Sequence, residues 1–424
     1  MLSIDYITNS KDDAIVGLKK RGFKNLDLLD SIIDLNNNRK KIQQELDNIL
    51  FKSNTISKEI AEAFKVGNTN INTDNLKSES SNLKLQSKSL AEELDRIKLK
   101  ISDLVSSVPN IPDSKVPDGL SEENNIEVFR SSNFKESGYN LKNHWDLSKE
   151  YDIIDFELGS KITGSGFPVY KDKGAKLQRA LINFFLDKNT SAGYKEFQVP
   201  HLVNSDSAFA TGQLPDKDGQ MYHVINDDFY LIPTAEVPLT NIYRDTILAV
   251  DQVPIMMTGY TPCFRREAGS YGSDVRGLNR LHQFDKVEIV RIEHPDKSDD
   301  ALIKMKEHIT EILTELKLDF RIINLCAGDL GFTSSITYDF EIFSKGQEKW
   351  LEISSVSNFK TYQSNRLNLK FKDKDGKNYS LHTLNGSSLA LPRVMAGLIE
   401  NNQSENGIII PDALLPYTGF NILN

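Results

Sequence analysis

Two long heptad repeats near the start of the chain constrain its fold more than any other feature. The first carries an apolar residue every seven positions and others four positions later, at Leu28, Ile32, Leu35, Ile42, Leu46, Ile49, Ile56 and Ile60. The second does so at Leu76, Leu83, Leu90, Leu94, Ile97, Ile101 and Leu104. An apolar seam with this period predicts a helix that packs along a partner helix. Residues 67–70, GNTN, predict a break between the two, so we expect the second helix to return antiparallel to the first.

The predicted pair of helices fits more than one role. At 1.5 Å per residue, helices of about 40 residues would form an arm on the order of 60 Å long. A coiled coil with no further assignment most often serves as a dimerisation element or a spacer. Its flanking positions mix Lys and Arg with Asp and Glu, and the net charge of the chain is -9. Contact with a nucleic acid would therefore depend on a few lysines rather than on general attraction to polyanions.

Length and composition exclude several classes of protein. A chain of 424 residues with 39% hydrophobic and 26% charged residues is typical of a soluble protein of two or three domains. No apolar run approaches the roughly 20 residues that span a bilayer, and residues 1–5 lack the basic and apolar regions of a secretory leader. We therefore expect a cytoplasmic protein without a membrane segment. Cys263 and Cys326 have no partners at metal-binding spacing, so we expect neither disulfides nor structural zinc.

An arginine-rich stretch in the second half of the chain predicts a ligand site. Residues 260–267 and 280–291 are expected to pair as antiparallel strands, because residues 283–290 alternate polar and apolar as a strand with one covered face does. Gly269, Gly272 and Gly277 lie in the loop between them. The side chains expected to gather on this hairpin are Phe264, Arg265, Glu267, Arg276, Arg280 and Phe284. Arginines beside a carboxylate and an aromatic ring can hold phosphates and a purine, and the alternative is a surface hairpin with solvated ion pairs.

This hairpin resembles a known motif. The string FRREAGSYGSDVRGLNRLHQFDKVE is similar to motif 2 of the class II aminoacyl-tRNA synthetases, in the version found in seryl-tRNA synthetases. The resemblance implies that Arg265, Arg266, Glu267, Arg280 and Phe284 bind ATP. Arg265 would stabilise the α-phosphate, Glu267 would meet the adenine edge, and Phe284 would stack on the ring.

Two earlier segments resemble the dimer unit and the amino-acid pocket of the same family. A helix predicted over residues 174–189 leads to a strand ending at residues 197–200, which resembles motif 1, the dimer interface of the family. Thr234, Ala235 and Glu236 are similar to the serine-binding loop. The resemblance implies that this loop and Arg265 bind serine. The carboxylate of Glu236 would bind the α-ammonium, and Glu288 would accept a hydrogen bond from the serine hydroxyl group.

Residues 352–358, EISSVSN, resemble the family strand EISSCSN. This likeness implies that Glu352, Ile353, Ser354 and Ser355 contact ATP, and that Glu352 and Ser355 hold the Mg²⁺ bound to it, since hard oxygen ligands suit that ion. The chain departs from the usual family pattern at two neighbouring positions where cysteines often stand, Val356 and Phe359.

Residues 385–393, NGSSLALPR, resemble motif 3 and are expected to open a helix that runs through Glu400. Ser387 would contact serine, and Arg393 would neutralise the γ-phosphate of ATP from a rigid helix. Pro392 replaces a residue that is often glycine, but proline is well tolerated in a first helical turn. Arg265 and Arg393 are thus the expected catalytic residues.

The resemblance covers the chain from end to end and implies an α+β protein. We expect a tRNA-binding antiparallel coiled-coil arm over residues 1–110, and over residues 111–424 a class II catalytic domain with six or seven antiparallel strands flanked by helices. The implied activity is that of a homodimeric serine–tRNA ligase that uses ATP and L-serine, charges tRNA(Ser) and commonly tRNA(Sec), and binds no DNA. The alternatives are a class II relative that activates an amino acid for a carrier protein, and a coiled-coil interaction protein with an inactive core.

Overall fold

The computed structural model describes all residues except 67–72, 132–137, 139, 217 and 269–275. It divides into two compact units, Met1–Lys19 with Phe23–Pro109, and Lys20–Gly22 with Asn110–Asn424. The helix break predicted at residues 67–70 and the loop glycines Gly269 and Gly272 lie outside the described residues. No described helix has the length and the apolar character needed to cross a membrane.

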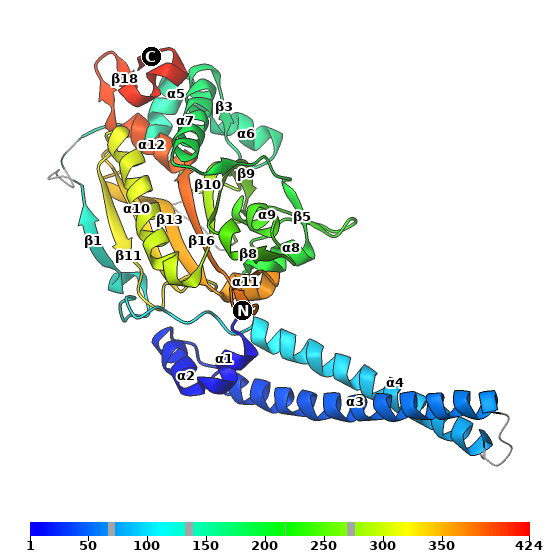
Figure 1. Ribbon diagram of the computed structural model, residues 1–424. Helices are drawn as coiled ribbons and strands as arrows, with labels where there is room; N and C mark the ends of the chain where they lie inside the picture. The colour runs from blue at the N-terminus through cyan, green and yellow to red at the C-terminus, as the bar shows by residue number, and fades with distance from the viewer. Residues whose placement is uncertain (67–72, 132–137, 139, 217, 269–275) are drawn as a thin grey trace. The chain divides into compact units, whose positions relative to one another are not determined.

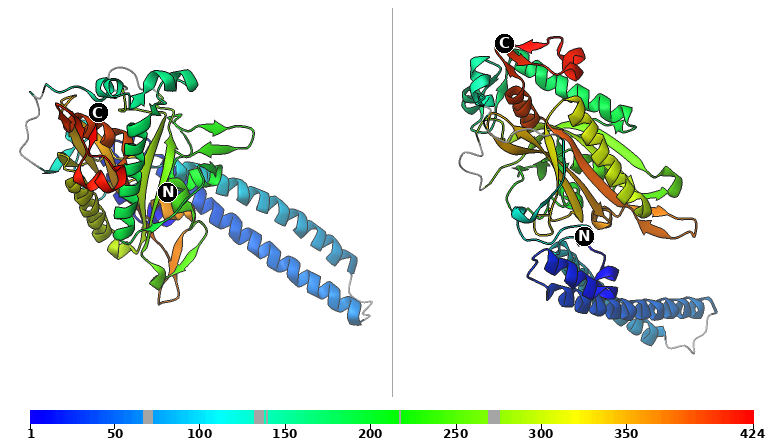
Figure 2. Two further views of the ribbon diagram at one scale, coloured as in Figure 1. Left: turned by 90° about the horizontal axis from the view of Figure 1, so that it is seen from above. Right: turned by 90° about the vertical axis from the view of Figure 1, so that its left-hand side faces the viewer.

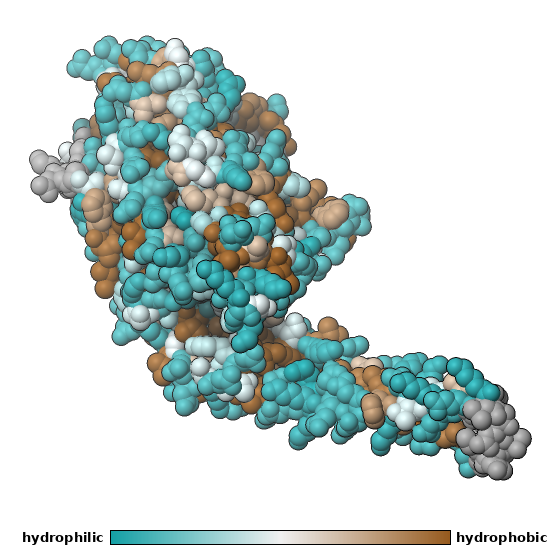
Figure 3. Space-filling model, viewed as in Figure 1, coloured by the Kyte–Doolittle hydropathy of each residue, from teal (hydrophilic) through white to brown (hydrophobic). Residues whose placement is uncertain are grey.

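The first unit is helical. Its helices are α1 (Ile4–Asn9), α2 (Lys11–Lys20), α3 (Leu28–Val66) and α4 (Thr73–Ser106). The two long helices, α3 and α4, run antiparallel along one another (Figure 1). Heptad positions are buried along their seam, including Ile42, Leu46 and Ile56 of α3 and Leu83, Leu94 and Ile97 of α4. The visible face of this arm is mostly hydrophilic (Figure 3). The heptad period therefore predicted the arm correctly.

The second unit is built on an eight-stranded sheet in the order β1-β11-β12-β13-β16-β10-β9-β4. Its strands are β1 (Ile126–Arg130), β4 (Lys195–Glu196), β9 (Ile255–Phe264), β10 (Gln283–Glu293), β11 (Phe320–Asn324), β12 (Ile336–Ser344), β13 (Lys349–Lys360) and β16 (His382–Ala390). Every neighbouring pair is antiparallel except β4 and β9. The expected count of six or seven strands was too low, because short edge strands such as β1 and β4 leave little periodic signal.

Three long helices pack against the sheet. They are α7 (Asp172–Ser191), α10 (Ser298–Glu315) and α12 (Leu391–Asn401), and Figures 1 and 2 show them lying along the strands. Their apolar sides share one hydrophobic core with the central strands, through residues such as Phe184, Met305 and Val394. This packing of helices on the sheet fixes the ends of β9, β10, β13 and β16, where the candidate site lies.

Shorter elements complete the unit. The helices are α5 (His144–Glu150), α6 (Phe156–Ile162), α8 (Ser205–Thr211), α9 (Glu236–Asn241), α11 (Tyr362–Leu367) and α13 (Leu415–Thr418). One small sheet pairs β2 (Ile154–Asp155) with β3 (Val169–Tyr170). A second has the order β5 (Leu202–Asn204), β7 (Phe229–Leu231), β6 (His223–Val224), and a third the order β15 (Asn378–Ser380), β14 (Lys370–Lys372), β8 (Ile247–Ala249). A fourth has the order β17 (Gln403–Ser404), β18 (Gly407–Ile409), β19 (Ile422–Leu423).

The elements around the predicted motifs agree with the sequence in part. The helix predicted over residues 174–189 is α7, but the strand after it is only Lys195–Glu196 and ends before the predicted residues 197–200. Phe197 still donates its backbone N–H to the carbonyl oxygen of Thr258 at 2.8 Å. Val356 and Phe359, which depart from the family pattern, are both buried, and Pro392 lies in the first turn of α12. These departures are accommodated as packing.

Candidate active site

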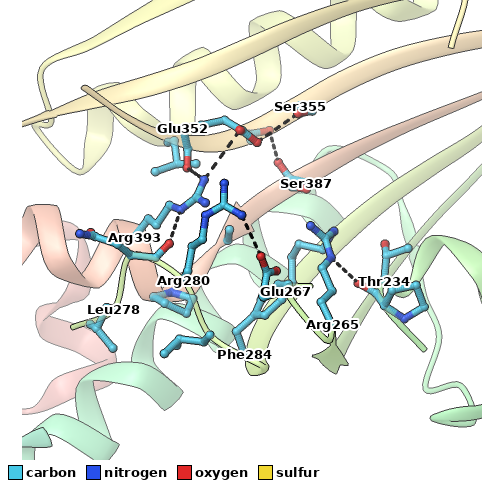
Figure 4. Close-up of a pocket in the computed structure, with 18 of the residues that line it drawn as sticks. Thr234, Arg265, Glu267, Leu278, Arg280, Phe284, Glu352, Ser355, Ser387 and Arg393 are labelled. Carbon is cyan, nitrogen blue, oxygen red and sulfur yellow. Dashed lines mark hydrogen bonds and ion pairs between the residues drawn. The ribbon is translucent and has the colours of Figure 1, made fainter. Parts of the chain in front are cut away.

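A cavity of about 500 Å³ lies in the second unit, where the β9–β10 hairpin meets β13, β16 and the start of α12. Twelve of the fifteen predicted site residues line it: Thr234, Glu236, Arg265, Glu267, Arg280, Phe284, Glu352, Ile353, Ser354, Ser355, Ser387 and Arg393. Figure 4 draws 18 of the lining residues and labels ten of them, with side chains from separate elements directed toward one another. The three predicted residues that do not line the cavity are Ala235, Arg266 and Glu288.

The hairpin supplies two arginines, a carboxylate and an aromatic ring, as expected. Arg265 follows β9, and its guanidinium carbon lies 5.3 Å from the centre of the Phe284 ring. Arg280 donates to Glu267 Oε2 at 3.0 Å across the loop (Figure 4). Arg276 does not join this group, because its guanidinium carbon lies 4.6 Å from the centre of the Trp145 ring. The hairpin thus presents two of its arginines to the cavity.

Arg393 is held between two neighbouring segments. Its Nε donates to the carbonyl oxygen of Asn279 at 3.0 Å, and its Nη1 donates to the carbonyl oxygen of Glu352 at 2.7 Å (Figure 4). The same Nη1 lies 3.7 Å from the carboxylate atom Oε2 of Glu352. Because the guanidinium is fixed by backbone carbonyls, its charge is directed into the cavity before any ligand arrives.

Glu352 and Ser355 offer a pair of hard oxygen ligands. The Ser355 hydroxyl donates to Glu352 Oε1 at 3.4 Å, and both side chains line the cavity. Burial and the neighbouring Glu352 raise the pKa of Asp339, which lies opposite Ser355 in the register of β12 and β13. In the described part of the chain, no group of three or more His, Cys, Asp or Glu side chains could hold a metal ion. Two oxygen ligands of this kind could serve Mg²⁺ together with phosphate oxygens and water, which this ion commonly keeps as ligands.

Glu288 lies behind the cavity wall, fully buried, with several hydrogen-bond donors around its carboxylate. Thr234 Oγ1 donates to Oε1 at 2.8 Å, and Asn385 Nδ2 donates to Oε2 at 2.8 Å. Ser387 Oγ donates to Oε1 at a longer 3.4 Å, and Lys286 forms an ion pair with the same oxygen. Donors on both oxygens fix the orientation of the carboxylate.

Two of these partners, Lys286 and Asn385, were not predicted as site residues, although both line the cavity. The prediction that β10 has one covered face was wrong, since Lys286 and Glu288 are as buried as their apolar neighbours Val287 and Ile289. β10 lies between β16 and β9 in the middle of the sheet, so both of its faces are covered. The signal that could have identified Lys286 is its position two residues before Glu288, on the same face of the strand.

Glu236 opens α9 and is 8% exposed. Its Oε1 accepts a hydrogen bond from Gln363 Nε2 at 2.6 Å. Burial is the main cause that raises the pKa of Glu236 to about 7, the nearby Glu288 adds to this rise, and the hydrogen bond from Gln363 opposes it. A buried carboxyl with so little compensation is suited to a ligand that brings its own positive charge.

The other two residues outside the lining have different surroundings. Ala235 is fully buried and caps α9, so only its backbone could serve a ligand. The side chain of Arg266 is exposed, while its backbone N–H donates to the carbonyl oxygen of Gln220 at 2.9 Å. Adjacent residues of an extended chain point to opposite sides, so Arg265 and Arg266 do not share the cavity. A role for Arg266 in ATP binding stays a prediction.

Residues 222–402 match the family model described as tRNA synthetase class II core domain (G, H, P, S and T), which covers β9, β10, β13, β16 and α12. An antiparallel sheet with arginines from a hairpin and from a following helix in one cavity therefore defines the chain as a class II aminoacyl-tRNA synthetase.

Further similarities are more specific. Residues 1–112 match the family model described as Seryl-tRNA synthetase N-terminal domain. The chain is 44% identical to the serine–tRNA ligase of Salinibacter ruber over 99% of its own length and 98% of that protein, and 44% identical to that of Hydrogenobaculum sp. over 98% and 99%. The crystal structure of seryl-tRNA synthetase from Pyrococcus horikoshii complexed with ATP superposes with a TM-score of 0.91 at 30% identity, covering 100% of this chain and 99% of that one. The chain belongs to the seryl-tRNA synthetase family and is an aminoacyl-tRNA ligase.

Proposed function

We propose that this chain activates L-serine with ATP to form seryl-adenylate in the cavity, and then transfers the seryl group to the 3′ end of tRNA(Ser). The observation that carries the proposal is one cavity lined by two chemically different groups of residues. Thr234, Glu236 and Ser387 are buried, whereas Arg280, Arg393, Glu352 and Ser355 add positive charges and oxygen ligands to the same lining. Arg265 lines the same space.

The buried lining residues fit a small amino acid with a hydroxyl group. Glu236 would form an ion pair with the α-ammonium of serine, which favours the charged form of a carboxyl that burial otherwise disfavours. Glu288 would accept a hydrogen bond from the serine hydroxyl. The hydroxyl would take the place of the Ser387 hydrogen bond, which at 3.4 Å is the longest that the Glu288 carboxylate accepts. A site built to satisfy a substrate hydroxyl can reject an analogue without it by roughly 10⁴-fold, because its polar groups are left unpaired.

The first reaction step needs no general base. The serine carboxylate is already an anion, so one of its oxygens attacks the α-phosphorus and forms a new P–O bond. The bond from that phosphorus to the bridging oxygen breaks on the opposite side, and pyrophosphate leaves with the electron pair. Arg265 would neutralise charge on the α-phosphate and Arg393 on the γ-phosphate, while Phe284 and Glu267 hold the adenine.

Glu352 and Ser355 would hold the Mg²⁺ that accompanies ATP. When bound, this ion supplies positive charge to the phosphate oxygens and helps the pyrophosphate to leave. The two side chains contribute fixed oxygen ligands on β13, and Arg393 lies next to Glu352, so the phosphate end of the nucleotide would be held by one compact group of charges.

The partners follow from this reaction. The arm formed by residues 1–110 would bind the tRNA, and residues 111–424 would be the catalytic domain. Two copies would form a homodimer through α7 and the segment around residue 197, which resembles motif 1. tRNA(Sec) would be a second substrate, because relatives in the family commonly serve it, and the reaction would take place in the cytoplasm, where tRNA is charged.

The proposal is tested by serine-dependent exchange between ATP and pyrophosphate, measured with each of the twenty amino acids. We expect exchange with serine alone and transfer to tRNA(Ser) transcripts, with tRNA(Sec) as a separate reaction. Exchange with another amino acid and transfer to a carrier protein would favour the carrier-protein alternative. Absence of exchange with every amino acid would favour an interaction protein with an inactive core.

A further inference from the structure

We propose that His144, together with Glu400, positions residues 276–282 so that Arg280 and Arg393 meet ATP at the correct place. These residues are the second half of the loop between β9 and β10, called here the motif 2 loop. This inference rests on the proposed function, since it concerns the nucleotide side of the same cavity. His144 is the first residue of α5 and is not among the described residues that line the cavity. It would therefore be a positioning residue.

The His144 ring is completely buried and is bonded at both nitrogens. Nδ1 lies 2.6 Å from Glu400 Oε1, and the backbone N–H of Leu278 donates to Nε2 at 2.8 Å. Because Nε2 accepts a hydrogen bond from an N–H group, the proton is on Nδ1 and is donated to the carboxylate. The ring thus links Glu400 of α12 to the backbone of the motif 2 loop.

Glu400 is the fixed end of this link. It lies seven residues after Arg393 on α12, which puts both residues on the same side of the helix. Its Oε1 also accepts from the backbone N–H of His144 at 2.9 Å and from Gln347 Nε2 at 3.0 Å, while Oε2 accepts from Ser344. Burial alone would raise the pKa of Glu400, but these hydrogen bonds from His144 and Ser344 outweigh it and lower that pKa.

A second path leads from the same carboxylate to the next loop residue. Because Gln347 donates to Glu400 through Nε2, its Oε1 faces the loop and accepts from Asn279 Nδ2 at 2.8 Å. Leu278 and Asn279 are therefore fixed by one buried carboxylate, through an imidazole and an amide. The carbonyl oxygen of Asn279 then accepts from Arg393 Nε at 3.0 Å.

The loop approaches the imidazole too closely for a side chain. Gly277 has φ of 66°, and a Cβ atom there would lie 2.2 Å from His144 Nε2. Next to it, Arg276 lies over the Trp145 ring, so α5 contacts three consecutive loop residues. Leu278, Asn279 and Arg280 all line the cavity, so displacing the loop would move ligand-facing atoms without removing any of them.

Two amide variants separate the two hydrogen bonds of the ring. His144→Asn keeps a donor at the position of Nδ1 for Glu400 but has no atom at Nε2, whereas His144→Gln keeps an acceptor at the position of Nε2 for Leu278. We expect His144→Asn to raise the KM for ATP about tenfold, equivalent to about 1.4 kcal/mol, with the KM for serine changed less than about twofold. His144→Gln should raise the KM for ATP by about threefold or less.

The control is His382→Asn, which changes a partly buried histidine that bonds Ser298 away from the cavity. It should leave both KM values unchanged. Equal effects of the Asn and Gln variants of His144, an unchanged KM for ATP, or a parallel rise in both KM values would overturn the positioning role. If His144→Asn does not fold, Gly277→Ala tests the same contact from the loop side and should raise the KM for ATP selectively.

The outcome can be separated from failure of the proposed function. ATP affinity measured by calorimetry without serine reports on the loop whichever amino acid is the substrate. A wild-type protein that binds ATP but shows no serine-dependent exchange would contradict the proposed function alone. Equal ATP affinity of the wild type and His144→Asn would contradict only the role of His144.

Discussion

The helical arm and the catalytic unit use polar residues in opposite ways. In the arm, one apolar seam holds α3 against α4, and the charged residues point to solvent. In the catalytic unit, charged residues such as Glu236, Glu288 and Glu400 are buried and fixed by hydrogen bonds. Burying a charge costs free energy unless partners compensate it, so a fold keeps such residues where chemistry requires them. The arm should therefore tolerate single surface changes, and the cavity should not.

The sharpest test of this contrast removes one cavity charge. Arg265→Ala should lower serine-dependent ATP/pyrophosphate exchange about 10³-fold, because it removes charge stabilisation at the α-phosphate. Thermal unfolding should stay close to wild type, since Arg265 is only partly buried. Lys304→Ala, an exposed change on α10 that also removes one positive charge, is the control. Exchange that survives the loss of Arg265 would exclude it from the mechanism.

The opposite test removes the arm. A variant in which residues 30–105 are replaced by a short flexible linker should retain exchange within about threefold but lose at least about 10²-fold in aminoacylation at low tRNA concentration. The reason is that the cavity is made entirely by the second unit. Aminoacylation rates at several tRNA and salt concentrations measure the effect. Unchanged charging at low tRNA concentration would show that the arm does not bind the substrate RNA.

Glu236→Gln tests the buried carboxyl itself. Loss of the ion pair with the α-ammonium should raise the KM for serine about 30-fold, or about 2 kcal/mol, with little change in the KM for ATP. Because the pKa of Glu236 is raised to about 7, the wild-type carboxyl is mostly neutral at pH 6. The wild-type KM for serine should thus fall about tenfold from pH 6 to pH 8, whereas the KM of the variant should stay flat. A similar pH profile in both proteins would exclude Glu236 as the group that binds the ammonium.

The same substitution has the opposite effect on stability without ligands. A folded-state pKa raised from 4.5 to about 7 means that stability is fully present below pH 4.5 and is lost as pH rises toward 7. Glu236→Gln stays neutral, so at pH 8 it should be more stable than wild type by up to about 3 kcal/mol, and at pH 4.5 the two should be similar. Unfolding curves without serine at both pH values measure this difference.

The smallest effect on chemistry is expected from the arm seam. Leu94→Ala removes a buried heptad side chain and should destabilise the arm by about 2–3 kcal/mol, while exchange stays at the wild-type level. Leu99→Ala, on the same helix but 67% exposed, should change stability by less than about 0.5 kcal/mol. Far-UV circular dichroism during thermal unfolding reports the difference. A drop in exchange for Leu94→Ala would break the separation between the two units.

Features with a local period or a continuous motif were determined by the sequence alone. The spacing of leucines and isoleucines predicted α3 and α4, because helix periodicity is set by neighbours within a few turns. The β9–β10 hairpin and the strings around Glu352 and Arg393 were also identified from the sequence, since each is a short continuous segment that resembles a family motif.

Contacts between distant segments were decided only by the tertiary structure. His144 and Glu400 are 256 residues apart, and no periodic pattern links them. The burial of Lys286 depends on β16 and β9 flanking β10, and Arg276 turned to Trp145 rather than to the cavity. The physical reason is that a side chain's partner depends on sheet order and helix packing, which bring together residues that carry no mark of one another in the chain.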